Sequence, residues 1–124
     1  MERELREVCC MKDELLAIER ALWSGGPEAY RRHVDDECLV AFTAMAGVKR
    51  RDEVAASVEG GPRWRDLEME LQGLLTPTET VAILTYRARA VRGNDERYSA
   101  LVSSAYVRRQ DGWKLIFHQQ TPLD

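Results

Sequence analysis

The second half of the chain is an almost continuous series of expected β-strands, and this feature limits the fold more than any other. Leu67, Met69 and Leu71 alternate with charged and polar residues, the period-2 pattern of a strand with one buried face. Short runs of turn residues separate three more expected strands, which span residues 81–92, 98–109 and 113–121. Consecutive strands joined by short turns form an antiparallel meander.

The first half of the chain predicts helices. Apolar residues recur at spacings of three and four along residues 8–22, which is one face of a helix: Val8, Met11, Leu15, Ile18 and Leu22. We expect Gly25 and Gly26 to end this helix, because glycine adopts the left-handed conformation of a helix cap. A short second helix is expected at residues 27–34, and the three acids at residues 35–37 oppose its dipole and end the helical part.

A strand at residues 38–45 and a third helix at residues 51–59 complete the first half. Helices followed by an uninterrupted meander predict a single α+β domain over residues 1–124, with N-terminal helices packed on a strongly curved antiparallel sheet. The curvature follows from strand length, since twelve residues span about 40 Å and strands of that length twist and bend. A bent sheet wrapped around a helix encloses a hollow.

Composition excludes several classes of protein. The 124 residues include 18 basic and 21 acidic side chains, a net charge of −3 that argues against a nucleic-acid-binding surface. No apolar run approaches the ~20 residues of a membrane span, and the charged N-terminus is unlike a signal peptide. Of the three cysteines, Cys9 and Cys10 are adjacent and Cys38 stands alone, which predicts reduced thiols and a cytoplasmic protein. The spacing of histidines and cysteines predicts no metal site, and without a glycine-rich phosphate loop we expect no cofactor.

The later strands carry apolar residues on both faces. Ile83 and Leu84 are adjacent in one strand, and Leu115 and Ile116 are adjacent in the last. Burial of a single face does not explain this pattern. We therefore expect the helices to cover one face of the sheet and a second copy of the chain to cover the other, giving a homodimer.

The terminal strand carries a family resemblance. The segment RRQDGWKLIFHQQTP, residues 108–122, resembles the last strand of the nuclear transport factor two-like superfamily. Similar segments end the SnoaL-like polyketide cyclases and the association domain of calcium/calmodulin-dependent kinase II. The resemblance implies a cone-shaped, cystatin-like roll with a pocket at its open end. The superfamily holds isomerases, dehydratases, cyclases and non-catalytic binding modules, so the function depends on the site.

The resemblance also implies pocket residues. Aligned with the kinase association domain, Arg87 and Gln120 take the positions of two pocket arginines, and Gln120 departs from the family pattern. Side chains two apart on a strand share a face, so Ile116, His118 and Gln120 are expected to face the pocket with Arg87.

Acid–base chemistry has two catalytic candidates. His118 titrates near neutrality and can move a proton, although a histidine on a strand can equally be structural. Asp36 is the best general base among the acids at residues 35–37, provided that burial raises its pKa. His33 and Tyr30 share one face of the second helix and are candidates for ligand contact.

Two aromatic residues complete the candidate site. Phe42 and Trp64 are expected to fill the core or the pocket wall, and Trp64 follows a Gly-Gly-Pro break that makes a lid the alternative. The leading interpretation is a protein that binds a small organic ligand in the cone. The alternatives are an isomerase, cyclase or dehydratase that uses His118 or Asp36, and a non-catalytic association module.

Overall fold

The computed structural model describes residues 2–123, and the side chains of residues 10–123; the side chains of Val8 and Cys9 lie outside this part. The helices are α1 (Glu2–Ser24), α2 (Pro27–His33) and α3 (Arg51–Ala56). The strands are β1 (Val34–Ala41), β2 (Ala46–Arg50), β3 (Trp64–Thr78), β4 (Val81–Arg92), β5 (Glu96–Arg109) and β6 (Gly112–Pro122).

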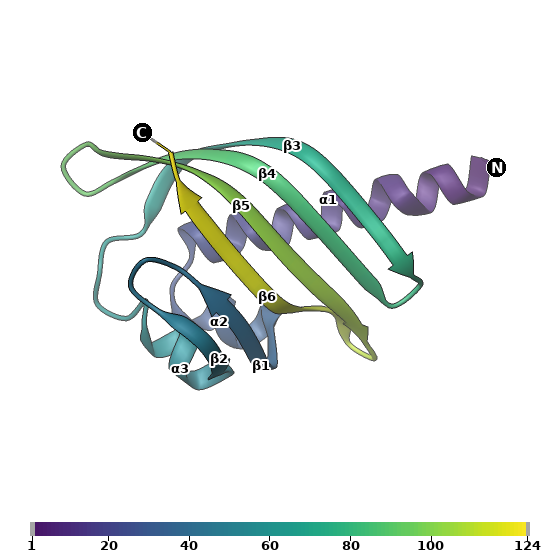
Figure 1. The fold of residues 1–124 in the computed structure, drawn as a ribbon, viewed down its shortest axis with the longest axis horizontal. Helices are drawn as coiled ribbons and strands as arrows, with labels where there is room; N and C mark the ends of the chain where they lie inside the picture. The colour runs from purple at the N-terminus through teal and green to yellow at the C-terminus, as the bar shows by residue number, and fades with distance from the viewer. Residues whose placement is uncertain (1, 124) are drawn as a thin grey trace.

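All six strands belong to one sheet in the order β2-β1-β6-β5-β4-β3. The long strands bend, and α1 runs across their concave side (Figure 1). The sheet departs from the expected antiparallel arrangement at one place, because β1 pairs with β6 in parallel. Most of the chain separates these two strands, so no tight hairpin dictates their relative direction.

The core lies between α1 and the concave face of the sheet, which we call the inner face. Leu15, Ile18 and Leu22 of α1 are buried there, as their spacing predicted. The facing strand positions carry small or apolar residues, among them Ala82, Leu84, Ala88, Ala100, Val102 and Leu115. Among the described residues, no helix is long and apolar enough to span a membrane.

Three local expectations need correction. The strand expected at residues 38–45 begins earlier, because residues 35–37, which follow the end of α2 at His33, already belong to β1. The segment after β1 turns back as the short strand β2, which pairs antiparallel with β1. β3 continues through Pro77, where a turn was expected, because proline is tolerated on a strand at the edge of a sheet.

Gly25 is required for a different reason from the one its sequence position indicates. Its φ is not positive, so it is no left-handed cap. A Cβ atom at this position would lie 2.6 Å from the Ala21 carbonyl oxygen and 2.9 Å from the Ala29 Cβ. Glycine therefore lets the start of α2 approach the end of α1 closely.

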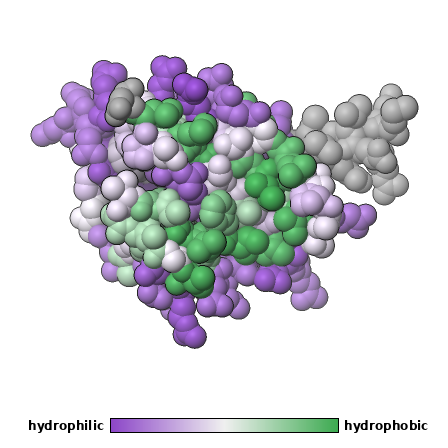
Figure 2. All heavy atoms as spheres, in the orientation of Figure 1, coloured by the Kyte–Doolittle hydropathy of each residue, from purple (hydrophilic) through white to green (hydrophobic). Residues whose placement is uncertain are grey.

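The opposite face of the sheet, the outer face, carries a row of apolar side chains that crosses all six strands. Each residue of this outer row lies directly opposite the next in the register: Val48, Leu39, Phe117, Ala105, Ile83 and Leu75. Val48 and Leu75, at the two ends, are 63% and 62% exposed. Hydrophobic residues gather over the sheet on this face (Figure 2). The two-sided apolar pattern of the sequence thus corresponds to an inner face covered by α1 and an outer face that none of the helices in the described part of the chain covers.

Candidate functional site

The interior of the cone contains a carboxylate. Glu19 of α1 lies on the same helix stripe as Leu15 and Leu22, and its side chain is 0% exposed. The Tyr86 hydroxyl of β4 donates to Glu19 Oε1 at 2.5 Å, and the Tyr106 hydroxyl of β5 donates to Oε2. Each carboxylate oxygen therefore has a donor, which a buried carboxylate needs to offset the loss of water.

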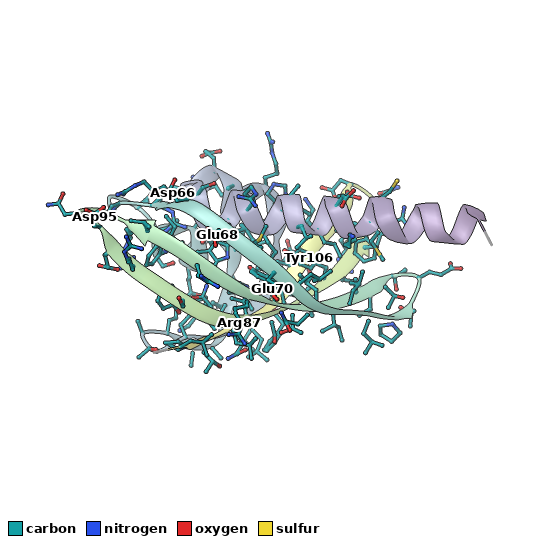
Figure 3. The ribbon with its side chains drawn as sticks, turned by 90° about the horizontal axis from the view of Figure 1, so that it is seen from above. Asp66, Glu68, Glu70, Arg87, Asp95 and Tyr106 are labelled. Atoms are coloured by element: carbon teal, nitrogen blue, oxygen red, sulfur yellow. The ribbon has the colours of Figure 1, made fainter. Side chains whose placement is uncertain are left out.

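Tyr86 and Tyr106 each interact with Glu19 as hydrogen-bond donors. Burial, reinforced by the Glu19 carboxylate, raises the pKa of Tyr86 and of Tyr106 well above the usual range. Both hydroxyls thus keep their protons at neutral pH. The Trp23 indole N–H donates to the Tyr86 oxygen at 2.8 Å, which polarises that hydroxyl toward Glu19. Tyr106 lies on the side of the sheet that faces α1 (Figure 3).

His118 of β6 approaches the same carboxylate from another side. Its Nδ1 lies 2.7 Å from Ser104 Oγ and 3.8 Å from Glu19 Oε1. Its Nε2 lies 3.0 Å from Gln120 Nε2, which can only donate. In this orientation of the Gln120 amide, its Oε1 accepts a hydrogen bond from the Tyr98 hydroxyl at 2.9 Å. His118 is therefore assigned as the tautomer with its proton on Nδ1 and an accepting Nε2.

The imidazole is neutral at pH 7. Burial lowers the pKa of His118, and the nearby Glu19 carboxylate only partly opposes this effect. A neutral imidazole with an accepting Nε2 can receive a hydrogen bond or a proton from a bound molecule. His118 is thus held from behind by polar partners, and its basic nitrogen lies on the side of Gln120.

A pocket of about 90 Å³ adjoins this nitrogen. It is lined by five of the residues expected at the site: Tyr30, Phe42, Trp64, His118 and Gln120. The other walls are apolar side chains from α1, β1, α3 and β6, together with Arg63. The space is much smaller than the roughly 300–1,000 Å³ of a site for a drug-sized molecule, so it suits a small ligand.

Tyr30 lines the wall, but its hydrogen is already engaged. Its hydroxyl donates to the Leu22 carbonyl oxygen at 2.8 Å and accepts from Arg63 Nη2 at 3.2 Å. Burial raises the pKa of Tyr30, and the Arg63 charge opposes that shift. Tyr30 therefore lines the pocket, as expected. Its hydroxyl, however, already forms hydrogen bonds with the backbone and with Arg63.

Trp64 belongs to an aromatic cluster at the edge of the pocket. Its ring stacks on Tyr98 with centroids 5.1 Å apart and meets the edge of Trp23 at 5.9 Å. Arg92 of the neighbouring strand β4 forms a cation–π contact with Trp64, with its guanidinium 4.2 Å from the centroid of the ring. Contacts with three neighbours favour a fixed wall over the mobile lid that was the alternative.

The prediction for Ile116 is wrong because the last strand contains a β-bulge. Leu115 lies opposite Tyr106, while Phe117 lies opposite Ala105, so Ile116 is an extra residue without a partner. The bulge reverses the face of every later side chain. Leu115 and His118 therefore share the inner face, and Leu115 lines the pocket in place of Ile116.

The prediction for Arg87 is also wrong. Tyr86 and Ala88 are buried on the inner face, so Arg87 between them is exposed on the outer face. It lies opposite Glu70 of β3 and away from Tyr106 (Figure 3). The family alignment gave the position in the strand but not the face.

Asp36 and His33 are not brought to His118. Asp36 is exposed and lies 3.4 Å from the Arg51 guanidinium. His33 lines an open polar groove on the other side of α2, where burial and the charge of Lys114 lower its pKa. Neither residue lines the pocket that contains His118, so the expected contributions of Asp36 and His33 to this pocket are wrong.

The buried carboxylate was missed, although the sequence carries a signal for it. Glu19 is four residues after Leu15 and three residues before Leu22, so it lies on the apolar face of the helix. An acid on a stripe of this kind must be buried with donors or must bind something. Its two tyrosine donors come from central strands, and only the strand register identifies them.

The chemistry of the site is that of hydrogen bonding and proton transfer. Among the side chains of residues 10–123, no three His, Cys, Asp or Glu gather as metal ligands do. Arg63, Gln120 and His118 are the polar side chains in an otherwise apolar and aromatic lining, apart from the Tyr30 hydroxyl. Such a site can orient one small molecule through one or two polar contacts.

Comparison with solved structures gives the fold. The chain is similar to an NTF2-like (nuclear transport factor two-like) protein of unknown function in nutrient uptake from Rhodospirillum rubrum, with a TM-score of 0.74, 15% identity, and coverage of 94% of this chain and 98% of that one. A ketosteroid isomerase-like protein from Parabacteroides distasonis gives a TM-score of 0.73 at 17% identity, over 89% of this chain and 86% of that one. The association domain of C. elegans CaMKII gives 0.71 at 14% identity, over 98% and 99%.

This chain therefore has the NTF2-like fold, as the resemblance of its terminal strand implied. No protein-family profile matches the sequence, and no curated protein matches it.

Proposed function

We propose that this protein binds a small organic molecule in the pocket at the open end of the cone. The observation that carries the proposal is the arrangement around His118, where a neutral imidazole is oriented from behind by Ser104 and Glu19. Its accepting nitrogen faces Gln120 within a mainly apolar wall. Apolar pockets with a few oriented polar groups are typical ligand sites.

Gln120 is the group that a ligand would replace. Its amide N–H donates to His118 Nε2, and an O–H or N–H group of a ligand makes the same hydrogen bond. Gln120 is only half-buried, so its side chain can turn outward when a ligand enters. The structural neighbours, which include an isomerase-like protein and an association domain, are consistent with binding but differ in function.

The test is ligand-observed NMR with three small probes of equal length: 1-butanol, butanamide and butanoate. We expect saturable binding of at least one probe to the natural chain, and loss of that binding in the double variant His118→Ala, Gln120→Ala. The matched control is Arg89→Ala on the outer face, which should bind as the natural chain does. Failure of all three probes to bind, or unchanged binding by the double variant, would contradict the proposal.

An acid–base enzyme of the isomerase, cyclase or dehydratase type is the second candidate. The observation that favours it is the carboxylate of Glu19 behind a neutral, basic His118. A base of this kind removes a proton next to a carbonyl. The test is exchange of the α-hydrogens of butanone in D₂O, which the natural chain should accelerate and His118→Ala should not; equal exchange by the two would count against catalysis by His118.

We further propose that the protein forms a homodimer through the outer face. The support is the outer row, whose apolar side chains cross all six strands without cover from the helices that the structure describes. Exposed apolar patches of this kind are typical of protein interfaces. Light scattering should give twice the chain mass at micromolar concentration, whereas a strict monomer would contradict the proposal.

A further inference from the structure

The guanidinium of Arg63 is fixed at the wall of the pocket by the end of α1. Its Nε donates to the Gly25 carbonyl oxygen at 2.6 Å, and its Nη2 donates to the Leu22 carbonyl oxygen at 2.7 Å. The same Nη2 donates to the Tyr30 hydroxyl at 3.2 Å. The side chain of Arg63 is partly buried. Three hydrogen bonds therefore hold a cation in one place without the cost of ordering it when a ligand binds.

The charge of Arg63 is not balanced by an acidic partner. Among the side chains of residues 10–123, no carboxylate forms an ion pair with it. The buried carboxylate of Glu19 accepts hydrogen bonds from the Tyr86 and Tyr106 hydroxyls and lies 3.8 Å from His118 Nδ1. The carbonyl end of a helix carries about half a negative charge, so it neutralises only part of a guanidinium.

One nitrogen of the guanidinium remains free. Nε and Nη2 use their hydrogens on the carbonyl oxygens and on Tyr30, while Nη1 has no acceptor among the described residues. Arg63 lines the same pocket as His118 and Gln120. A fixed guanidinium nitrogen with two unused N–H groups is a donor for a carboxylate oxygen.

We propose that the pocket selects small monocarboxylates, with the acid group of the ligand held by Arg63 Nη1. This inference rests on the proposed binding function of the pocket and names its ligand class. The aliphatic part of the ligand lies against Phe42, Val54 and Trp64, which supply the apolar wall. A polar group at the far end of the ligand, where present, reaches His118.

The pocket favours a carboxylate over other anions and over neutral molecules. A phosphate needs more donors than one guanidinium nitrogen supplies, and His118 presents an accepting nitrogen that repels a second anionic group. The volume of about 90 Å³ limits the ligand to a few heavy atoms. An amide or alcohol of the same length leaves the charge of Arg63 without a partner.

The test compares butanoate with butanamide and 1-butanol on the natural chain. A charge-assisted hydrogen bond should make butanoate bind about tenfold more tightly than the two neutral probes. Raising the salt concentration should weaken butanoate binding and leave butanamide binding unchanged. Equal affinity for the charged and neutral probes would overturn the inference.

Substitution of Arg63 locates the effect. Arg63→Gln should weaken butanoate binding about tenfold and change butanamide binding less than twofold. The control Arg89→Gln removes an exposed charge from the outer face and should change neither. Because Arg63 also binds the end of α1, the thermal melt of each variant is measured, and the ¹⁵N resonances of the Arg63 guanidinium are followed in the natural chain during the butanoate titration. A shift of those resonances supports the contact, and their constancy at saturation contradicts it.

The outcomes separate this inference from the proposed function. If no probe binds the natural chain, the proposed function fails and the inference fails with it. If the neutral probes bind and lose affinity in the His118→Ala, Gln120→Ala variant, while butanoate has no advantage, only the inference fails.

Discussion

The two faces of the sheet each contain groups that a protein seldom places there: polar side chains within the core of the inner face and a row of apolar side chains on the exposed outer face. The inner face buries Glu19, His118 and Ser104 under a helix. The outer face exposes apolar side chains of the outer row, among them Ile83 and Leu39. Both arrangements cost stability in an isolated chain unless the groups meet partners.

The difference lies in where the partners come from. On the inner face each buried polar side chain finds its hydrogen bonds within the described part of the chain, and no buried side-chain atom there is left without one. On the outer face, residues 2–123 provide no helix that covers the outer row. The inner face therefore satisfies its polar groups within the chain, whereas the outer row is the surface that we propose a second copy of the chain covers.

Glu19→Ala should give the largest effect on the inner face. The change leaves the Tyr86 and Tyr106 hydroxyls without an acceptor and opens a cavity, so we expect a loss of about 3 kcal/mol or more in the free energy of unfolding. Glu14→Ala, an exposed glutamate on the same helix, should cost less than about 0.5 kcal/mol. Urea denaturation measures both, and similar losses would mean that the buried network contributes little.

Ile83→Lys tests the outer face. A lysine at this position of the outer row, between Ala105 and Leu75, should weaken the dimer at least about tenfold, because a charge must be buried in the interface. The fold should persist, since Ile83 packs on no core residue of the inner face. Arg89→Glu, on the same face but outside the outer row, is the matched control. Analytical ultracentrifugation that finds the Ile83→Lys dimer as tight as the natural one would exclude the outer row as the interface.

Stability should fall as the pH drops below about 6.5. Burial lowers the folded-state pKa of His118, so the unfolded chain binds protons more readily, and folding loses free energy in acid. His33 has a lowered pKa as well, but it is less buried. His118→Asn should therefore flatten the dependence between pH 7 and pH 5 more than His33→Asn does. Thermal melts between pH 7 and pH 5 measure this dependence of stability on pH. An equal dependence in the natural chain and in both variants would refute the assignment of a buried neutral imidazole.

The smallest expected effect concerns cysteine reactivity. Cys38 lies buried on the inner face, where burial and the charge of Glu19 raise its pKa to about 12. Cys10 is exposed on α1. A maleimide should modify Cys10 within minutes and leave Cys38 unmodified until the protein unfolds. Rapid labelling of Cys38 in the native protein, detected by peptide mass analysis, would show that the inner face opens readily.

The sequence predicts the architecture because periodicity reports burial directly. The apolar stripe of α1 and the alternation at Leu67, Met69 and Leu71 identified the helix and a strand, and the two-sided pattern at Ile83 and Leu84 identified a face without cover. The short strand β2 was missed, because five residues with a glycine carry little pattern.

The candidate site was predicted only in part. His118, Gln120, Tyr30, Phe42 and Trp64 line one pocket, as expected. The error at position 116 in β6 came from a bulge, which the strand alternation alone does not reveal. The buried glutamate and the pocket arginine were missed because their partners come from segments distant in sequence, and only the folded register brings those segments together.

The central claim is that the inner face binds a small molecule and that the outer face binds a second copy of the chain. Native mass spectrometry of protein purified from its natural source, compared with the same protein denatured, tests this claim most directly. We expect a mass of twice 14.2 kDa plus a small adduct that denaturation releases. An adduct whose formula contains a carboxyl group would also support the proposed contact with Arg63. A monomer would contradict the role of the outer face. A dimer that never carries a small molecule, even with the three probes in excess, would contradict the role of the inner one.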